Sequence, residues 1–173
     1  GRVSGEVRGR NLDGSDAGPI AGAGVVVRLV DGSGGSEVAT TDAAGSFVVG
    51  RAPTGKAVLK VTPPVPWVKE HWVGLTVAPG QSVTQDAAVE KGCQIDLTIQ
   101  DTEGALLPHA YVSIEGPYPA GPYHYSSSAP SPSGVATFTQ LWAGTYRAYV
   151  SPPGSPPGLR SQELWLKVAP GQA

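Results

Sequence analysis

The stretch Leu75-Thr76-Val77-Ala78-Pro79-Gly80-Gln81 returns near the end of the chain as Leu166-Lys167-Val168-Ala169-Pro170-Gly171-Gln172. The two copies lie about 90 residues apart, which is close to the length of one small β-sandwich. In both copies an apolar-polar-apolar alternation precedes a Pro-Gly pair, a pattern typical of a strand that ends in a tight turn. The repetition indicates that the chain contains a duplicated unit.

Further blocks of the two halves correspond in the same order. Each block alternates apolar residues with polar residues or Gly, and turn-forming residues bound it, so we expect each block to form a strand. The corresponding blocks, first half and then second half, are residues 3–7 and 95–99, 19–27 and 106–114, 42–49 and 131–138, and 54–61 and 143–150.

The period of two in these blocks predicts which side chains face a core. For the first copy the predicted inward residues are Val3, Val7, Val25, Val27, Phe47, Val49, Leu59, Val61, Leu75 and Val77. For the second copy they are Ile95, Leu97, Ile99, Val112, Ile114, Phe138, Tyr146, Ala148, Val150, Leu166 and Val168. Asp42 and Gly45 are expected to form the tight turn of a hairpin, with the carboxylate accepting backbone N–H groups.

Composition favours strands and excludes several partners. The 173 residues include 24 Gly and 17 Pro, which leaves few stretches long enough for a helix. The hydrophobic fraction of 40% is too high for a disordered tail. Lys and Arg number 12 against 14 Asp and Glu, so no basic stripe is available for nucleic acid. No apolar run reaches the roughly 20 residues that span a bilayer.

These observations predict an all-β chain of two tandem immunoglobulin-like β-sandwich domains, residues 1–91 and 92–173. The junction Glu90-Lys91-Gly92 is short, so we expect a fairly fixed end-to-end arrangement. The chain begins with Gly1 and has neither Met nor a signal peptide, which favours a fragment or processed form of a longer protein.

The last strand differs between the two copies. After the first Pro-Gly turn, residues 82–89 are expected to form a closing strand, whereas the second copy stops at Ala173, directly after its turn. One interpretation is that the fragment simply ends there. The other is that a neighbouring subunit supplies the strand by adding it to the open edge of the second domain.

The first copy also resembles a known family. Its blocks read P-I-A-G-A-x-V at 19–25, T-D-x-x-G-x-F at 41–47, G-x-x-x-L-x-V at 55–61 and L-T-V-A-P-G-Q at 75–81. This order resembles the carboxypeptidase regulatory-like family, which is transthyretin-like, and the collagen-adhesin B-type repeats. The resemblance implies seven-stranded sandwiches and a stalk, accessory or adhesive module in exported bacterial proteins, with no chemistry of its own. The second copy departs from it at 131–134.

A segment rich in Tyr, Ser, Gly and Pro, residues 116–128, is the first candidate binding site. Its composition is typical of recognition loops, where rigid amphipathic rings provide contact area. The candidate residues are Tyr118, Tyr123, His124 and Tyr125. The alternative is a hairpin loop whose tyrosines cover the edge of the sandwich.

Trp67 and Trp72, beside the prolines of 63–66, form the second candidate. The family resemblance implies that Trp67 plugs the end of the sandwich, and Trp72 is expected to be partly exposed. Together they could form a platform for a glycan, although packing is the alternative. Trp142 and Trp165 are interpreted in the same way, with Trp165 in a strand at an outward or edge position.

No arrangement of residues indicates catalysis or metal binding. The three His residues lie far apart, without the spacing of metal ligands. Cys93 is the one cysteine and has no nearby His to lower its pKa, so it is interpreted as a core residue, with an intermolecular disulfide as the alternative. The loop 11–16 is expected to be an Asx-turn loop rather than a cation site. We predict no catalytic residue, no metal and no cofactor.

The sequence therefore predicts a non-catalytic structural or adhesive module of an exported bacterial surface or fibre-forming protein, located outside the cell. It would act as a spacer and contact other subunits or neighbouring domains of the same protein. Two alternatives remain open. One is a carbohydrate- or peptide-binding module that uses the exposed Tyr and Trp residues, and the other is an accessory domain of a larger secreted enzyme.

Overall fold

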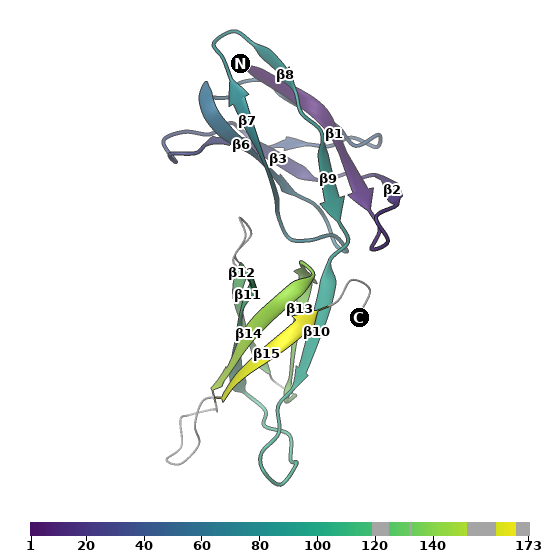
Figure 1. Ribbon diagram of the computed structural model, residues 1–173, viewed down its shortest axis with the longest axis vertical. Coiled ribbons are helices and arrows are strands. Elements are labelled where there is room, and N and C mark those ends of the chain that lie inside the picture. The colour runs from purple at the N-terminus through teal and green to yellow at the C-terminus, as the bar shows by residue number, and fades with distance from the viewer. Residues whose placement is uncertain (119–124, 132, 152–161, 169–173) are drawn as a thin grey trace. The chain divides into compact units, whose positions relative to one another are not determined.

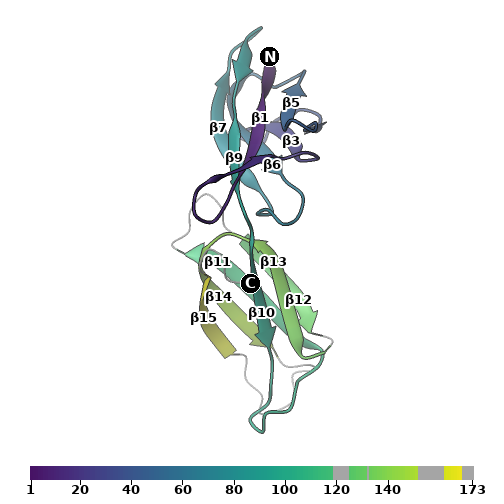
Figure 2. The same ribbon diagram turned by 90° about the vertical axis from the view of Figure 1, so that its right-hand side faces the viewer.

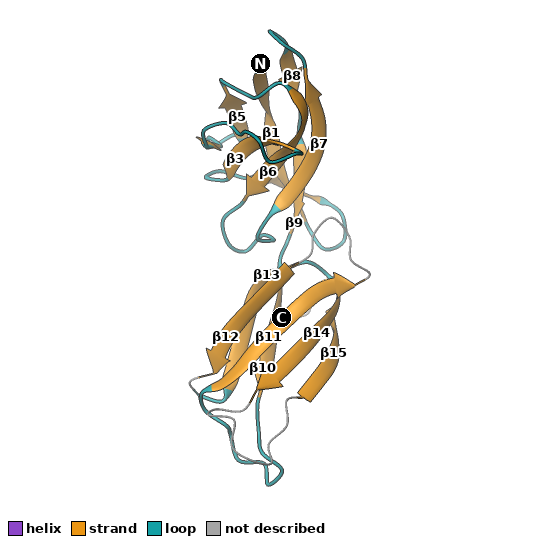
Figure 3. Ribbon diagram, turned by 90° about the vertical axis from the view of Figure 1, so that its left-hand side faces the viewer, coloured by secondary structure: helices purple, strands orange, loops and turns teal. Residues whose placement is uncertain are grey.

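The computed structural model describes residues 1–118, 125–131, 133–151 and 162–168, and of residues 118, 125–131 and 162 it describes the backbone alone. The chain separates into two compact units, unit 1 (Gly1–Gly92) and unit 2 (Cys93–Ala173). The described residues form strands and loops without any helix, as Figure 1 and Figure 3 show. No helix that could cross a bilayer occurs among them. The all-β prediction is confirmed.

Unit 1 is a sandwich of two sheets. Its strands are β1 (Arg2–Arg10), β2 (Asp16–Pro19), β3 (Gly24–Leu29), β4 (Ala39–Thr40), β5 (Ser46–Val49), β6 (Gly55–Thr62), β7 (His71–Val77), β8 (Ser82–Thr84) and β9 (Ala87–Glu90). In the first sheet, β1 pairs antiparallel with β2 and β5 and parallel with β8 and β9. The second sheet has the antiparallel order β4-β3-β6-β7.

Unit 1 contains more strands than the seven that the family resemblance implies, because the expected strands are subdivided. The closing strand predicted over 82–89 is present as β8 and β9, separated by Gln85 and Asp86. The block 19–27 is interrupted by a turn at Gly22, whose φ is 74°, a value that glycine adopts without a steric cost. The sandwich architecture itself follows the prediction.

The core of unit 1 consists of the side chains that the alternation places inward. The buried members of the predicted set are Val3, Val7, Val25, Val27, Phe47, Val49, Leu59, Val61 and Val77. Leu75 is half-buried instead, because it lies on β7 at the edge of its sheet. Asp42 forms the predicted turn: its Oδ1 accepts the N–H groups of Ala44 and Ser46, both at 2.9 Å.

Unit 2 repeats this plan with β10 (Cys93–Thr98), β11 (Ala110–Tyr118), β12 (Tyr125–Ser131), β13 (Val135–Leu141), β14 (Gly144–Ser151) and β15 (Gln162–Val168). One sheet pairs β10 with β13, and the other has the order β12-β11-β14-β15. The predicted inward residues form its core, although Leu97, Val150 and Leu166 are only partly buried. Cys93 belongs to this core, in agreement with its interpretation as a packing residue.

The strand registers of the two units are equivalent, which supports the duplication independently of sequence likeness. The aligned blocks predict which cross-strand pairs should correspond, and the structure contains them. These pairs, unit 1 and then unit 2, are Val3–Val49 and Ile95–Phe138, Val25–Val61 and Val112–Val150, and Gly55–Val77 and Gly144–Val168. The turn of unit 2 lacks the Asp of unit 1 but keeps the same hydrogen bond to the first strand. In unit 1, Gly45 O accepts the Val7 N–H at 2.8 Å, and in unit 2, Gly134 O accepts the Ile99 N–H at 2.8 Å.

The loop 11–16 is an Asx-turn loop, as predicted. Asp13 Oδ1 accepts hydrogen bonds from the N–H and the hydroxyl of Ser15 at 2.9 and 2.6 Å. These bonds lower the pKa of Asp13, the side-chain bond being the larger cause. Within the described ranges, no three His, Cys, Asp or Glu side chains gather where one metal ion could bind them.

Candidate functional site

The first and last strands of unit 1 run side by side in the same direction. Residues Arg2 to Ser4 pair with Ser82 to Thr84, and further along β1 residues Val7 to Arg10 pair with Ala87 to Glu90. Figure 2 shows β9 alongside β1 within this unit. A parallel pair of terminal strands has a direct consequence for the path of the chain. The chain enters unit 1 at one end of β1 and leaves it at the other end.

The interruption between β8 and β9 is stabilised by two specific contacts. Gln85 donates its N–H to Ser4 O at 2.8 Å, and Asp86 Oδ1 accepts the N–H of Glu6 at 2.8 Å. Gly5 makes this close passage possible, because a Cβ at Gly5 would lie 2.1 Å from Gln85 O. From the sequence pattern, Gly5 is one alternating position of a strand, and this role was not predicted. A Gly inside a strand is the signal that could have indicated it.

The ends of the paired strands are also anchored in unit 1. Arg2 donates its N–H to Gln81 O at 3.0 Å at the entry. At the exit, Lys91 donates its N–H to Arg10 O at 3.1 Å, and Gly92 donates to Pro66 O at 2.8 Å. The junction residues 91 and 92 are therefore hydrogen-bonded to unit 1, and β10 begins at the next residue.

Trp67 packs against the end of β1. The ring covers Gly9, where an added Cβ would lie 2.1 Å from Trp67 Cη2, and the side chain is half-buried. Its backbone forms an isolated antiparallel bridge with Lys91. This position gives Trp67 a packing role beside the exit strand, and its proposed role in ligand binding stays a prediction.

Trp72 lies on the outward face of β7, opposite Lys60 of β6. The Lys60 ammonium is 5.1 Å from the centroid of the Trp72 ring and 2.6 Å from Glu70 Oε1. The charge of Lys60 is thus shared between a carboxylate and an aromatic face. The Trp67 ring covers Gly9 of β1, whereas Trp72 lies on β7 beside Lys60, so a joint platform stays a prediction.

The tyrosine-rich candidates lie largely outside the described structure. The backbone of Tyr118 belongs to β11 and pairs with Thr145, and the backbone of Tyr125 begins β12 opposite Gly116. Tyr123 and His124 lie outside the described residues. Their role in recognition therefore stays a prediction.

A cluster that the sequence pattern does not predict lies on the outward face of unit 2. Arg147 of β14 has Glu115 of β11 directly opposite on one side and Trp165 of β15 on the other. Its Cζ is 4.8 Å from the centroid of the Tyr149 ring and 5.9 Å from that of Trp165. Its guanidinium nitrogens lie 3.6 Å from Glu115 Oε2 and 3.8 Å from Glu163 Oε1. We call these five residues the Arg147 cluster.

One edge of β10 differs from the corresponding edge of β1. Within the described ranges β10 pairs with β13 alone, whereas the other edge of β1 carries β8 and β9. Leu97 occupies the position that corresponds to Gly5, and it packs against the core of unit 2. A strand added to this edge would meet a side chain where unit 1 has none. Strand addition by another subunit stays a prediction and would need a path different from that of β8 and β9.

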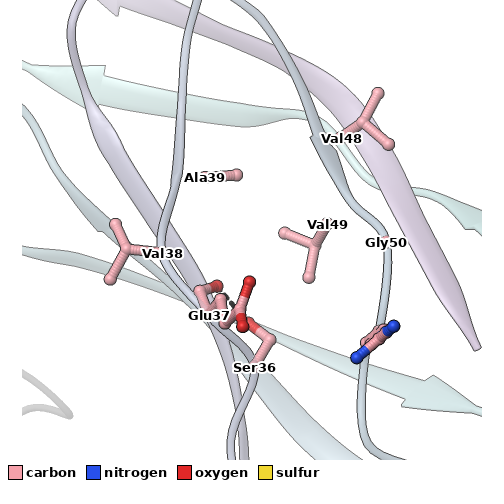
Figure 4. A pocket seen from close by; sticks show the side chains of 8 residues that line it. Ser36, Glu37, Val38, Ala39, Val48, Val49 and Gly50 are labelled. Atoms are coloured by element: carbon pink, nitrogen blue, oxygen red, sulfur yellow. Dashed lines mark hydrogen bonds between the residues drawn. The ribbon is translucent and has the colours of Figure 1, made fainter.

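A hollow of about 490 Å³ lies between the edge strands β4 and β5 of unit 1 (Figure 4). Val38 and Val48 flank it and are 69% and 49% exposed. Glu37 and Arg51 supply its charges, and Ser36 donates its hydroxyl hydrogen to the Glu37 carbonyl at 2.8 Å. The lining contains no His, Cys or Lys beside this serine to activate it as a nucleophile. The hollow is therefore lined by apolar side chains together with one charge of each sign.

The chain was compared with protein-family models, curated proteins and solved structures. No protein-family model and no curated protein matches the chain. Among solved structures, the Bacillus anthracis TIE protein is 17% identical with a TM-score of 0.41, over 99% of this chain and 32% of that one. A streptococcal ancillary pilin is 15% identical with a TM-score of 0.43, over 96% and 58%. The shaft pilin spaA of Lactobacillus rhamnosus GG is 13% identical with a TM-score of 0.37, over 99% and 94%.

This chain therefore spans about a third of the first of these proteins and little more than half of the second. All three TM-scores are below 0.5, so the sandwich assignment is based on the strand pairing of this chain. The narrower resemblance to carboxypeptidase regulatory-like domains stays a prediction.

Proposed function

We propose that the chain is a non-catalytic structural segment of an exported surface or fibre-forming protein, in which unit 1 transmits tension between its neighbours. The observation that carries this proposal is the parallel pairing of β1 with β8 and β9. Neighbouring domains or subunits would pull on unit 1 through its two chain ends. The sequence blocks shared with stalk and adhesin modules support the location outside the cell.

Parallel terminal strands resist tension because of the direction of their hydrogen bonds. Force on Gly1 pulls β1 toward its start, while force on Lys91 pulls β9 toward its end. The two strands are then displaced along their common axis in opposite directions. The hydrogen bonds between parallel strands are evenly spaced and run across from one strand to the other, so a displacement along the axis strains all of these pairs at once. In a hairpin pulled open at one end, by contrast, the pairs break one after another.

The contacts of unit 1 deliver force to these strands directly. Gly1 O accepts the Ala52 N–H at 3.0 Å, which fixes the entry. At the exit, the N–H groups of Lys91 and Gly92 are bonded within unit 1. No free linker residue separates the exit strand from the first strand of unit 2. Tension in the chain therefore reaches the β1–β9 pairs without first extending a slack segment.

Single-molecule force spectroscopy on the full chain tests this proposal. Attachment through cysteines at Gly1 and Lys91 loads the terminal strands in shear, and attachment at Gly1 and Pro79 peels β8 from the start of β1. We expect unit 1 to unfold at a several-fold higher force in the first geometry. Substitution of the buried Cys93 by Ser keeps the attachment specific, and its folding is checked by circular dichroism.

Equal unfolding forces in the two geometries would contradict the tension-bearing role. A higher force in the peeling geometry would contradict it as well. A matched control places both cysteines on β6 and β7, at Lys56 and Thr76, which face each other across an antiparallel pair and do not load β1.

A further inference from the structure

Three aromatic side chains form a diagonal stripe across the outward face of unit 2. Tyr111 of β11 lies opposite Ser151 of β14. Ser151 follows Tyr149 by two residues, so both are on the same face of β14. Trp165 of β15 lies opposite Arg147, two residues before Tyr149. The stripe Tyr111–Tyr149–Trp165 therefore crosses three adjacent strands. Diagonal neighbours on a sheet lie about 7–8 Å apart, within the reach of aromatic side chains.

The stripe faces away from the core. Tyr146 and Ala148, which alternate with Arg147 and Tyr149 along β14, are fully buried on the other side of the sheet. Trp165 is 58% exposed and Tyr111 is 53% exposed. Such exposure leaves a large apolar ring surface in contact with water, which is unfavourable unless a ligand or partner covers it. The register of β11, β14 and β15 thus collects aromatic surface on one face of the unit.

Charged groups of both signs surround the rings at fixed positions. Arg147 lies over Tyr149 and Trp165 and is flanked by Glu115 and Glu163. The guanidinium offers hydrogen-bond donors and the two carboxylates offer acceptors, with one positive charge against two negative charges. The face therefore combines flat apolar surface with paired donors and acceptors and has no excess of positive charge.

We propose that the aromatic stripe binds a neutral carbohydrate chain. A pyranose ring has an apolar C–H face that can lie on an aromatic ring and hydroxyl groups at its edge that both donate and accept hydrogen bonds. Glu115 and Glu163 would repel an acidic polysaccharide or a nucleic acid. A proline-rich peptide needs a groove between aromatic rings, whereas Arg147 fills the space between Tyr149 and Trp165. This inference adds a binding function to unit 2 and is independent of the tension-bearing role of unit 1.

Affinity electrophoresis of the full chain tests the inference with four soluble neutral polysaccharides: hydroxyethylcellulose, xylan, galactomannan and laminarin. We expect at least one of them to retard the protein. Trp165→Ala should weaken that retardation about fivefold in apparent Kd, because a stacked aromatic contact of this kind is worth on the order of 1 kcal/mol. Tyr149→Ala should weaken it too. Circular dichroism establishes that each variant is folded, and Trp165→Phe provides a conservative variant that should retain part of the binding.

The matched control is Val30→Ala, which truncates an apolar side chain of unit 1 that is 67% exposed and belongs to neither candidate site. It should leave retardation unchanged. The inference is overturned if none of the four polysaccharides retards the protein, or if Trp165→Ala and Val30→Ala bind equally well. Binding of poly-L-proline or of heparin in place of the neutral chains would also overturn it, in favour of a peptide or a polyanion.

Discussion

Gly5 is the residue of unit 1 whose lack of a side chain matters most for the terminal strands. Its replacement by Ala places a Cβ against the backbone carbonyl of Gln85, which is not a flexible group that could move aside. We expect Gly5→Ala to lower the free energy of unfolding by about 1–3 kcal/mol, the usual range for an overpacked site. Urea denaturation measures the change as a shift of the unfolding midpoint.

The control for this substitution is Gly74→Ala. Gly74 also lies in a strand, β7, but an added Cβ there meets no atom within 4 Å. We expect its stability to change by less than about 0.5 kcal/mol. If both variants lose the same free energy of unfolding, the cost at Gly5 arises from replacing any strand Gly by Ala and not from a clash of the new Cβ with the Gln85 carbonyl.

His71 gives unit 1 a dependence on pH. It lies half-buried on β7 opposite Val61, and burial lowers its pKa from the ordinary value of 6.5 because the charged form loses hydration. The unfolded chain then binds more protons than the folded chain as the pH falls through 6.5, so the free energy of unfolding decreases in that window. We expect less stability at pH 5 than at pH 7, and a smaller difference in His71→Gln.

Urea denaturation at the two pH values checks this expectation. Hydrogen bonds lower the pKa values of three carboxyl groups from 3.8, those of Asp13, Asp16 and Asp96. These groups titrate below the window between pH 5 and pH 7 and do not contribute to the difference measured there. An unchanged pH dependence in the Gln variant would assign the effect to other groups.

At the scale of strands, Asp86 lies in the gap between the end of β8 and the start of β9, where its carboxylate takes the place of a backbone carbonyl as hydrogen-bond acceptor. Its carboxylate accepts the Glu6 N–H, which would otherwise have no partner strand at that point. We expect Asp86→Ala to destabilise unit 1 by about 0.5–1.5 kcal/mol, while Asp86→Asn, which retains an acceptor oxygen, should cost less. Hydrogen exchange should be faster at the Glu6 amide in the Ala variant, and exchange that does not change would contradict the bond.

Strand pairing also determines which charged residues lie beside Trp165 in unit 2. The alternation of the sequence placed Trp165 outward, and the structure confirms that it is exposed. Its neighbours Arg147 and Glu115 come from strands 18 and about 50 residues away in the chain, so their proximity depends on the register of β11, β14 and β15. Period-two patterns identify the face of a strand but not which residue of the next strand lies opposite.

At the scale of the whole molecule, each unit has its own core, so damage to one should leave the other folded. Ile114 is fully buried in unit 2, and Ile114→Ala should destabilise that unit by about 2–5 kcal/mol. Hydrogen exchange read by mass spectrometry should show faster exchange in peptides of unit 2 and unchanged exchange in peptides of unit 1. The equivalent variant Val27→Ala should give the reverse pattern, and loss of protection across the whole chain in either variant would contradict separate cores.

The sequence by itself determined the all-β class, the duplication and most inward-facing side chains, because the period of two and the Pro-Gly turns are local properties that each strand carries in its own residues. The parallel pairing of β1 with β8 and β9, the passage of residue 85 over Gly5, and the aromatic stripe were decided by tertiary structure alone. These features join residues that are distant in the chain, and their contacts arise from strand order and register. A local pattern of alternation contains no information about either.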